Sequence, residues 1–87
     1  MKTIWKYTLQ PDIILEMPAG AEVLSVREQG DEINMWALVD PNAEKEERRF
    51  MGFGTGHDVP SAMFKKFIGT AHLQGGSLVF HVFETYL

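Results

Sequence analysis

Apolar and polar residues alternate along most of this chain, and a period of two predicts β-strands. Residues 2–9 place Trp5, Tyr7 and Leu9 on one side and more polar residues on the other, as a half-buried strand does. Residues 13–17 form a second short strand between two proline-containing breaks. Nowhere do apolar residues recur over three turns at the spacing of a long amphipathic helix.

Residues 22–39 carry the pattern of a β-hairpin, with Gly30-Asp31 as a two-residue turn between two alternating segments. In that register two apolar pairs lie opposite each other, Val26 with Met35 and Leu24 with Ala37. The reverse side mixes polar and apolar residues, namely Val23, Ser25, Arg27, Asn34, Trp36 and Leu38. The hairpin therefore has one apolar face, typical of a core, and one mixed face.

Residues 68–84 carry the pattern of a second hairpin, in which Gly75-Gly76 can supply the positive φ angles of a tight turn. This turn pairs Leu73 with Leu78, His72 with Val79, Ala71 with Phe80 and Thr70 with His81. One face is wholly apolar and is predicted to lie in the core: Ala71, Leu73, Leu78, Phe80 and Val82. The other face is mixed: Ile68, Thr70, His72, Val79, His81 and Phe83. We expect this mixed face to be either a second buried layer or a binding surface.

The remaining segments complete an all-β pattern. Residues 40–49 are highly charged and are predicted to form a solvated connection, while residues 50–53 resume a strand. Residues 54–60 form a loop, and residues 61–67 are long enough for one helical turn. We predict a single all-β, or β-dominated α+β, domain over residues 1–87. Six to seven strands would form a small antiparallel barrel or sandwich with at most one short helical turn.

Composition narrows the classes of function. The chain has 87 residues, 45% of them hydrophobic; because a chain this short buries only about 60–65% of its unfolded surface, we expect a homo-oligomer, as a dimer. It has no cysteine, which excludes disulfides and thiolate chemistry. It also lacks the run of roughly 18 apolar residues that a membrane span needs. A net charge of −4 disfavours binding to long nucleic acid but permits a small anion in a locally positive pocket.

One glycine-rich loop is a candidate anion site. In Gly54-Thr55-Gly56-His57 the glycines let backbone N–H groups approach an anion closely, and the threonine and histidine add donors. The loop lacks the lysine of a phosphate-binding P-loop. The simpler interpretation is an ordinary turn between strands.

Three histidines, His57, His72 and His81, are the candidate metal ligands or bases. None stands at a recognised metal-ligand spacing, so we expect neither a metal nor a cofactor. The cross-strand pair of Thr70 and His81 lacks a third group to orient a base, so we do not expect an enzyme. The simpler interpretation is that these are half-buried histidines bonded to the backbone or to threonine.

Trp36 and Arg27 are diagonal neighbours on the mixed face of the first hairpin. An indole and a guanidinium are suited to stacking on a base and holding a phosphate. The same two residue types are typical of protein interfaces. A third interpretation is internal packing, with the N-terminal strand covering Trp36 and with Arg27 over its ring.

Several blocks occur together in a familiar order: MKTIWKY at 1–7, EMPAGA at 16–21, WALVDP at 36–41, GTGH at 54–57 and FHVFE at 80–84. With them the chain resembles, over nearly its whole length, a family of short uncharacterised proteins of tailed phages and prophages. The resemblance implies a non-structural accessory protein in the cytoplasm of a bacterial host, and it brings no catalytic residues. Small phage accessory proteins often counter host defence, either by binding host proteins or by sequestering nucleotide signals.

Three functions follow for comparison. The first is non-catalytic binding of a cyclic nucleotide or ADP-ribose-type ligand by a homo-oligomer, through Arg27, Trp36, Gly54, Thr55, Gly56, His57 and His81. The second is a protein-binding inhibitor of a host defence or nucleic-acid-processing enzyme, for which the acidic charge is suited. The third, and least favoured, is an enzyme acting on a nucleotide with His57 or His81 as base.

Overall fold

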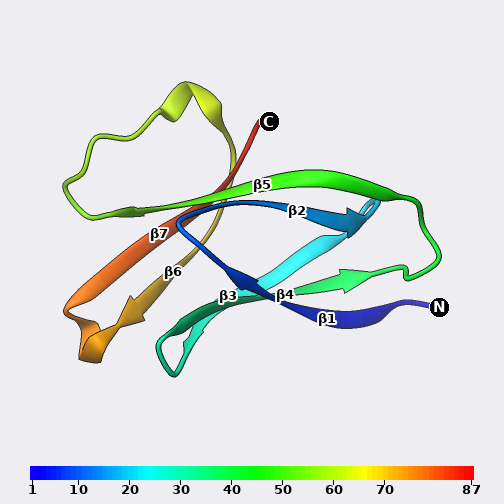
Figure 1. The fold of residues 1–87 in the computed structure, drawn as a ribbon, viewed down its shortest axis with the longest axis horizontal. Coiled ribbons are helices and arrows are strands. Elements are labelled where there is room, and N and C mark those ends of the chain that lie inside the picture. The colour runs from blue at the N-terminus through cyan, green and yellow to red at the C-terminus, as the bar shows by residue number, and fades with distance from the viewer.

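The computed structural model describes all 87 residues as seven β-strands with two single-turn 3₁₀ segments (Figure 1). Their bounds are β1 Thr3–Leu9, β2 Asp12–Pro18, β3 Glu22–Gln29, β4 Glu32–Val39, β5 Lys45–Gly54, η1 Ser61–Met63, β6 Phe64–Leu73, η2 Gln74–Gly76 and β7 Leu78–Thr85. The all-β prediction is confirmed, although the helical content is two short turns rather than one. No helix has the length and apolar character needed to cross a membrane.

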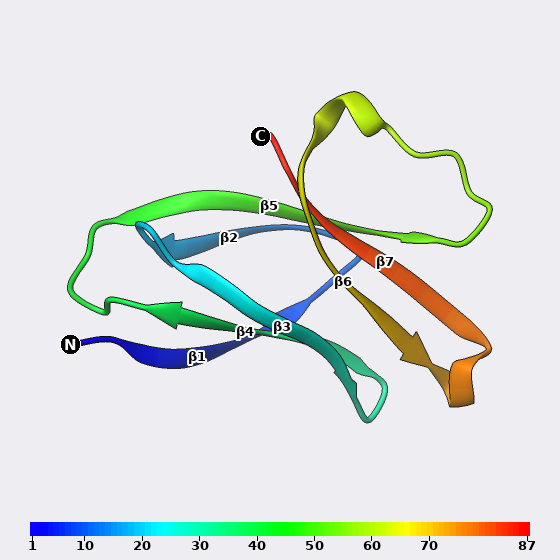
Figure 2. The same ribbon diagram turned by 180° about the vertical axis from the view of Figure 1, so that it is seen from behind.

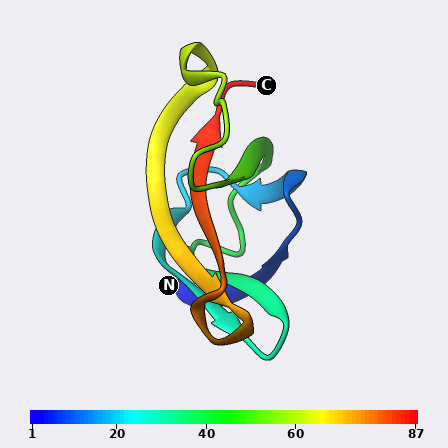
Figure 3. The ribbon, with the colours of Figure 1, turned by 90° about the vertical axis from the view of Figure 1, so that its left-hand side faces the viewer.

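The strands form two antiparallel sheets, one in the order β1-β4-β3 and the other in the order β2-β5-β7-β6. Figures 1 and 2 show the chain crossing from one sheet to the other between β1 and β2 and again between β2 and β3. The molecule is thin in its third dimension, with Cα extents of 39 × 30 × 15 Å (Figure 3). The architecture is therefore an open sandwich and not a closed barrel.

The sheets approach each other most closely where β3 lies beside β6. There Gly69 faces Val26, and a Cβ at Gly69 would lie only 3.2 Å from the Val26 Cβ. The two strands are not paired by a ladder. The missing side chain at Gly69 thus allows one side of the sandwich to pack tightly without closing.

The register predicted for the β6–β7 hairpin is confirmed at all four pairs, from Thr70 opposite His81 to Leu73 opposite Leu78. Ala71 is fully buried and Val82 nearly so, as expected for the core face. Leu78, however, is 41% exposed, and Phe80 is only partly buried. The reason is that β5 pairs with β7 only as far as Phe80, so the end of the hairpin extends beyond its neighbour.

Two β-bulges correct the predicted faces. In β3 the register shifts between Val23 and Ser25, so that Val23 and not Leu24 lies opposite Ala37, and Leu24 is left exposed. In β6 a second shift lies between residues 67 and 69, and Ile68 packs against the core instead of joining the mixed face. A bulge inserts one unpaired residue, which reverses the side on which the following residues point.

The core between the sheets is small and apolar. Its ten buried members are Leu9, Met17, Ala21, Val26, Met35, Ala37, Val39, Phe50, Ala71 and Val82. They come from all seven strands or their immediate flanks. Because so few side chains are fully buried, polar contacts between the sheets matter for stability.

The charged segment predicted to be a solvated connection is a connection only up to Glu44, since β5 begins at Lys45. A run of charges conceals the alternation of this strand. Arg49 forms an outer ion pair with Asp12, at 2.7 Å between Nη2 and Oδ2. Its neighbour Arg48 points inward and binds Glu84 on β7.

The Arg48–Glu84 pair is buried, with 14% and 5% of the two side chains exposed. Nε and Nη2 of Arg48 donate to the two carboxylate oxygens at 2.8 and 2.7 Å. Nη1 donates to the backbone carbonyl of Ala21, at 2.6 Å, at the start of the other sheet. One guanidinium therefore joins β5, β7 and the chain entering β3.

A second polar group in this region, the hydroxyl of Tyr7, is buried but has no hydrogen-bond partner. Burial raises the pKa of the Tyr7 phenol above its ordinary value, and the nearby Arg48 charge opposes that rise. The neutral phenol is thus the form that the folded state favours.

We expect Glu84→Gln to lower the free energy of unfolding by about 3–5 kcal/mol, because it leaves the buried Arg48 charge without its counter-ion. The matched control is Asp12→Asn, which breaks the exposed pair on the adjacent residue of β5 and should change stability little. Urea denaturation measures both. If Glu84→Gln and Asp12→Asn lowered the free energy of unfolding equally, the central role of the buried Arg48–Glu84 pair would be contradicted.

Tyr7→Phe should leave the protein as stable or raise its free energy of unfolding by about 1–3 kcal/mol, because the buried hydroxyl is unsatisfied. A raised folded-state pKa adds stability below the unfolded value of about 10, and this stability is lost as pH rises through the folded pKa. Above about pH 10 the free energy of unfolding of the wild type should therefore fall more steeply with pH than that of the variant. A clear destabilisation by Tyr7→Phe at neutral pH would show that the hydroxyl is in fact bonded.

Candidate functional site

The mixed face of the β6–β7 hairpin is the outer face of the four-stranded sheet, and the loop after β5 folds over part of it. Between loop and sheet lies an open groove of about 300 Å³. Its lining residues are Phe53, Gly54, Thr55, Gly56, His57, Val59, Phe64, Phe67, His81 and Phe83. Of the two alternatives for this face, a second buried layer is wrong, since His72 is exposed and Thr70, His81 and Phe83 are only partly buried. We call it the aromatic groove.

Four phenylalanines form the floor of the aromatic groove. Phe64 and Phe83 are stacked, with ring centroids 3.9 Å apart and ring planes 10° apart. Phe53 lies 5.5 Å from Phe64, and Phe67 meets Phe83 edge-on at 5.3 Å. Cross-strand aromatic pairs of this kind stabilise a sheet. Phe67 nevertheless remains 53% exposed, so part of an aromatic surface faces solvent.

His81 forms the polar edge of the groove, where two threonine hydroxyls hold its ring. Oγ1 of Thr55 lies 2.8 Å from Nε2, and Oγ1 of Thr70 lies 3.2 Å from Nδ1. Thr70 is the cross-strand partner of His81, whereas Thr55 comes from the loop after β5. Because both ring nitrogens have a hydroxyl partner, the imidazole is fixed in orientation.

The glycine-rich loop places His57 against the sheet. The His57 amide closes the turn by donating to the Gly54 carbonyl at 3.3 Å. The imidazole lies over Gly54 so closely that a Cβ there would be 2.8 Å from Cε1 of His57. The amides of Thr55 and Gly56 donate no backbone hydrogen bond, and Gly56 has a φ of +85°. Two backbone donors therefore remain available beside the imidazole.

The predicted ligand-binding residues fall into two groups. Gly54, Thr55, Gly56, His57 and His81 come together at one end of the aromatic groove.

Arg27 and Trp36 do not join them. They lie on the outer face of the three-stranded sheet, where Trp36 pairs with Lys6 and Ser25. Arg27 is diagonal to Trp36 as predicted, but it forms no cation–π contact with the indole. One protomer alone does not bring this pair to the groove.

Of the four phenylalanines in the groove, the sequence pattern predicts only Phe83 on this face. Phe64 and Phe67 lie within residues 61–67, where the sequence predicts a helical turn, but only residues 61–63 are helical and β6 begins at Phe64. Phe53 was placed in a strand without a face. Residues 64–68 (FKKFI) do not alternate, because the register of β6 shifts between Phe64 and Lys66 and again between Phe67 and Gly69, so no local period of two marks the start of this strand.

The structure contains no group of three histidine, aspartate or glutamate side chains arranged to hold a metal ion. Comparison with known proteins gives one match: the model of a family described as "Domain of unknown function (DUF7352)" covers residues 1–87. No curated protein and no solved structure matches the chain. The groove must therefore be interpreted from its own chemistry.

Gly54→Ala should push the His57 ring away from the sheet, because the new Cβ would overlap its Cε1 and Nδ1 atoms. The Hε1 resonance of His57 in a ¹H–¹³C spectrum should move, while that of His72 stays in place. Gly52→Ala is the control, since a Cβ there meets atoms only at 3.8 Å and beyond. An unshifted His57 resonance in Gly54→Ala would contradict the placement of the ring.

Proposed function

We propose that this chain, which belongs to the DUF7352 family of domains of unknown function, binds and sequesters a small nucleotide in the aromatic groove without changing it chemically. The observation that carries this function is the half-exposed Phe67 ring beside the fixed edge of Thr55 and His81. Any nucleobase can stack on an exposed aromatic ring, because every base has a π-face. Hydroxyl and imidazole groups can form hydrogen bonds with the edge of the base.

The phosphate of such a ligand is assigned to the turn at the end of the groove. The free amides of Thr55 and Gly56 and the imidazole of His57 lie there. Successive backbone amides next to a positive-φ residue are suited to an anion. No carboxylate lines the groove, so nothing in its wall repels a phosphate.

Two features support binding without catalysis. His81 has threonine hydroxyls on its ring nitrogens, but no carboxylate lines the groove to orient it as the base for a threonine nucleophile. The groove also lacks a carboxylate that could orient His57 as a base. A ligand held here would be retained intact, as sequestration requires.

The biological setting is taken from the resemblance to tailed-phage and prophage proteins. In that setting the protein is a counter-defence factor in the cytoplasm of the bacterial host, and its ligand is a cyclic nucleotide or ADP-ribose-type signal. We assign it a homodimer, since Ile4, Phe67, Tyr86 and Leu87 are all well exposed. A second copy could bring its Trp36 and Arg27 to the groove of the first.

Titration calorimetry with cyclic mononucleotides, cyclic dinucleotides and ADP-ribose tests this function. Phe67→Ala should weaken binding about 5- to 150-fold, the equivalent of about 1–3 kcal/mol for one stacked base. Ile14→Ala is the matched control: Ile14 is also 53% exposed and lies outside the groove. The affinity of the Ile14→Ala variant for the nucleotide should equal that of the wild type.

Several results would contradict the proposed function. Absence of heat with every nucleotide, or equal losses in the two variants, would favour the protein-binding inhibitor. Recovery of an altered nucleotide after heating the complex would indicate an enzyme. A Trp36→Ala variant shows whether the binding site is formed by one copy of the chain or by two. It weakens binding only if a partner copy contributes its indole to the groove.

A further inference from the structure

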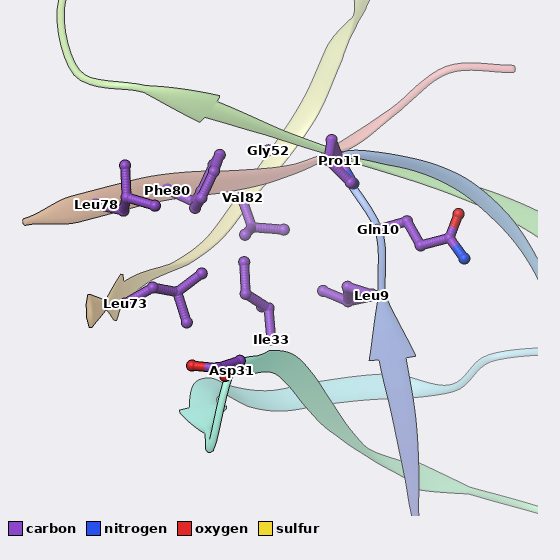
Figure 4. A pocket seen from close by; sticks show the side chains of 10 residues that line it. All are labelled: Leu9, Gln10, Pro11, Asp31, Ile33, Gly52, Leu73, Leu78, Phe80 and Val82. Carbon is purple, nitrogen blue, oxygen red and sulfur yellow. The ribbon is translucent and has the colours of Figure 1, made fainter.

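A second space in the molecule lies between the two sheets and shares no lining residue with the aromatic groove. This inner cavity has a volume of about 320 Å³ and is found at the end of the sandwich where the β3–β4 and β6–β7 hairpins turn (Figure 4). Its size falls at the lower end of the range for small-molecule sites, about 300–1,000 Å³. An apolar cavity of about half this volume accommodates benzene.

The wall of the inner cavity is apolar. Six side chains form most of it: Leu9, Ile33, Leu73, Leu78, Phe80 and Val82. In Figure 4 Leu9, Ile33 and Val82 converge on a common space, whereas the amide of Gln10 points away from it. Water gains few hydrogen bonds in such a place, so an apolar occupant is favoured over solvent.

Gly52 is a second, independent sign that this space is kept open. It lies within β5, the strand between β2 and β7, where glycine is less favourable than a residue with a side chain. A Cβ at Gly52 would lie 3.8 Å from Phe80 and 3.9 Å from Val82, so the structure has room for one. Glycine inside a strand often marks a place where a ligand approaches the backbone closely.

Asp31 sets the polarity of the rim. It is exposed on the turn between β3 and β4, and no other charged residue lines the cavity. A carboxylate accepts hydrogen bonds and attracts cations, but it repels a second carboxylate. The head group at this rim should therefore be a hydroxyl or an amine rather than an acid.

We propose that the inner cavity binds a small apolar molecule whose head group is an alcohol or an amine. The apolar body lies among Leu9, Ile33 and Val82 over Gly52, and the head group faces Asp31. This site is separate from the nucleotide function proposed above, so either can fail without the other.

The neutral dye N-phenyl-1-naphthylamine serves as the probe. Its fluorescence should rise and saturate at one dye per chain. Decylamine and 1-decanol should displace it at concentrations at least tenfold lower than decanoate. Asp31→Asn should reduce the difference between decylamine and decanoate, because it removes the charge that distinguishes them.

Gly52→Val should reduce dye binding at least tenfold by filling the cavity, while the melting temperature is kept or raised. If this variant fails to fold, Gly52→Ala provides the same test with a smaller side chain. Ile14→Ala, outside both spaces, should bind the dye as the wild type does.

Four results would overturn this inference: no saturable dye binding, equal displacement by decanoate and decylamine, unchanged binding in the Gly52 variants, or loss of binding in Phe67→Ala alone. The last would place the dye in the aromatic groove. A dye signal that disappears as the protein self-associates would also overturn it, because a second copy would then close the cavity.

Discussion

The buried contact of Arg48 with Glu84 is the constraint on which the rest of the structure depends. Its guanidinium also binds the Ala21 carbonyl, so it fixes β5 and β7 against the entry to β3 in a sandwich whose apolar core is small. A bidentate pair of this kind has a defined geometry, so it is compatible with only one register of β5 and β7, in which Glu84 lies opposite Phe50. Since side chains alternate, placing Glu84 inward also places Phe83 and His81 outward, where the groove is built.

The fold was predictable where local pattern and turn chemistry agree. The turns Gly30-Asp31 and Gly75-Gly76 between alternating segments predict both hairpins, with the register right at Val26–Met35 in the first and at all four predicted pairs in the second. The bulges at Leu24 and Ile68 were not predictable, because no local pattern in either strand marks which residue is left unpaired. The inward turn of Arg48 was hidden as well, since its partner is 36 residues away and its neighbours are all charged.

The site was predictable only in part, for a related reason. The glycine-rich loop and His81 come together because β5 pairs with β7, and strand alternation placed His81 on an outer face. Trp36 and Arg27 also lie on an outer face, but on the other sheet. Composition indicates which residues can bind a nucleotide and carries no information on which sheet each face belongs to. Phe64 and Phe67 are not predicted to line this face, because a helical turn is predicted over residues 61–67 whereas β6 begins at Phe64.

Strand β7 has a further consequence, because alternate residues of this one strand line two different spaces. His81 and Phe83 face the aromatic groove, while Phe80 and Val82 face the inner cavity. An occupant that shifts or stiffens β7 from one side therefore changes the wall on the other. Such energetic coupling is reciprocal by thermodynamic necessity: the factor by which a first ligand alters the affinity for a second is the factor by which the second alters the affinity for the first. Under the two proposals made above, the eight residues of β7 form a shared partition between two chemically unlike ligands.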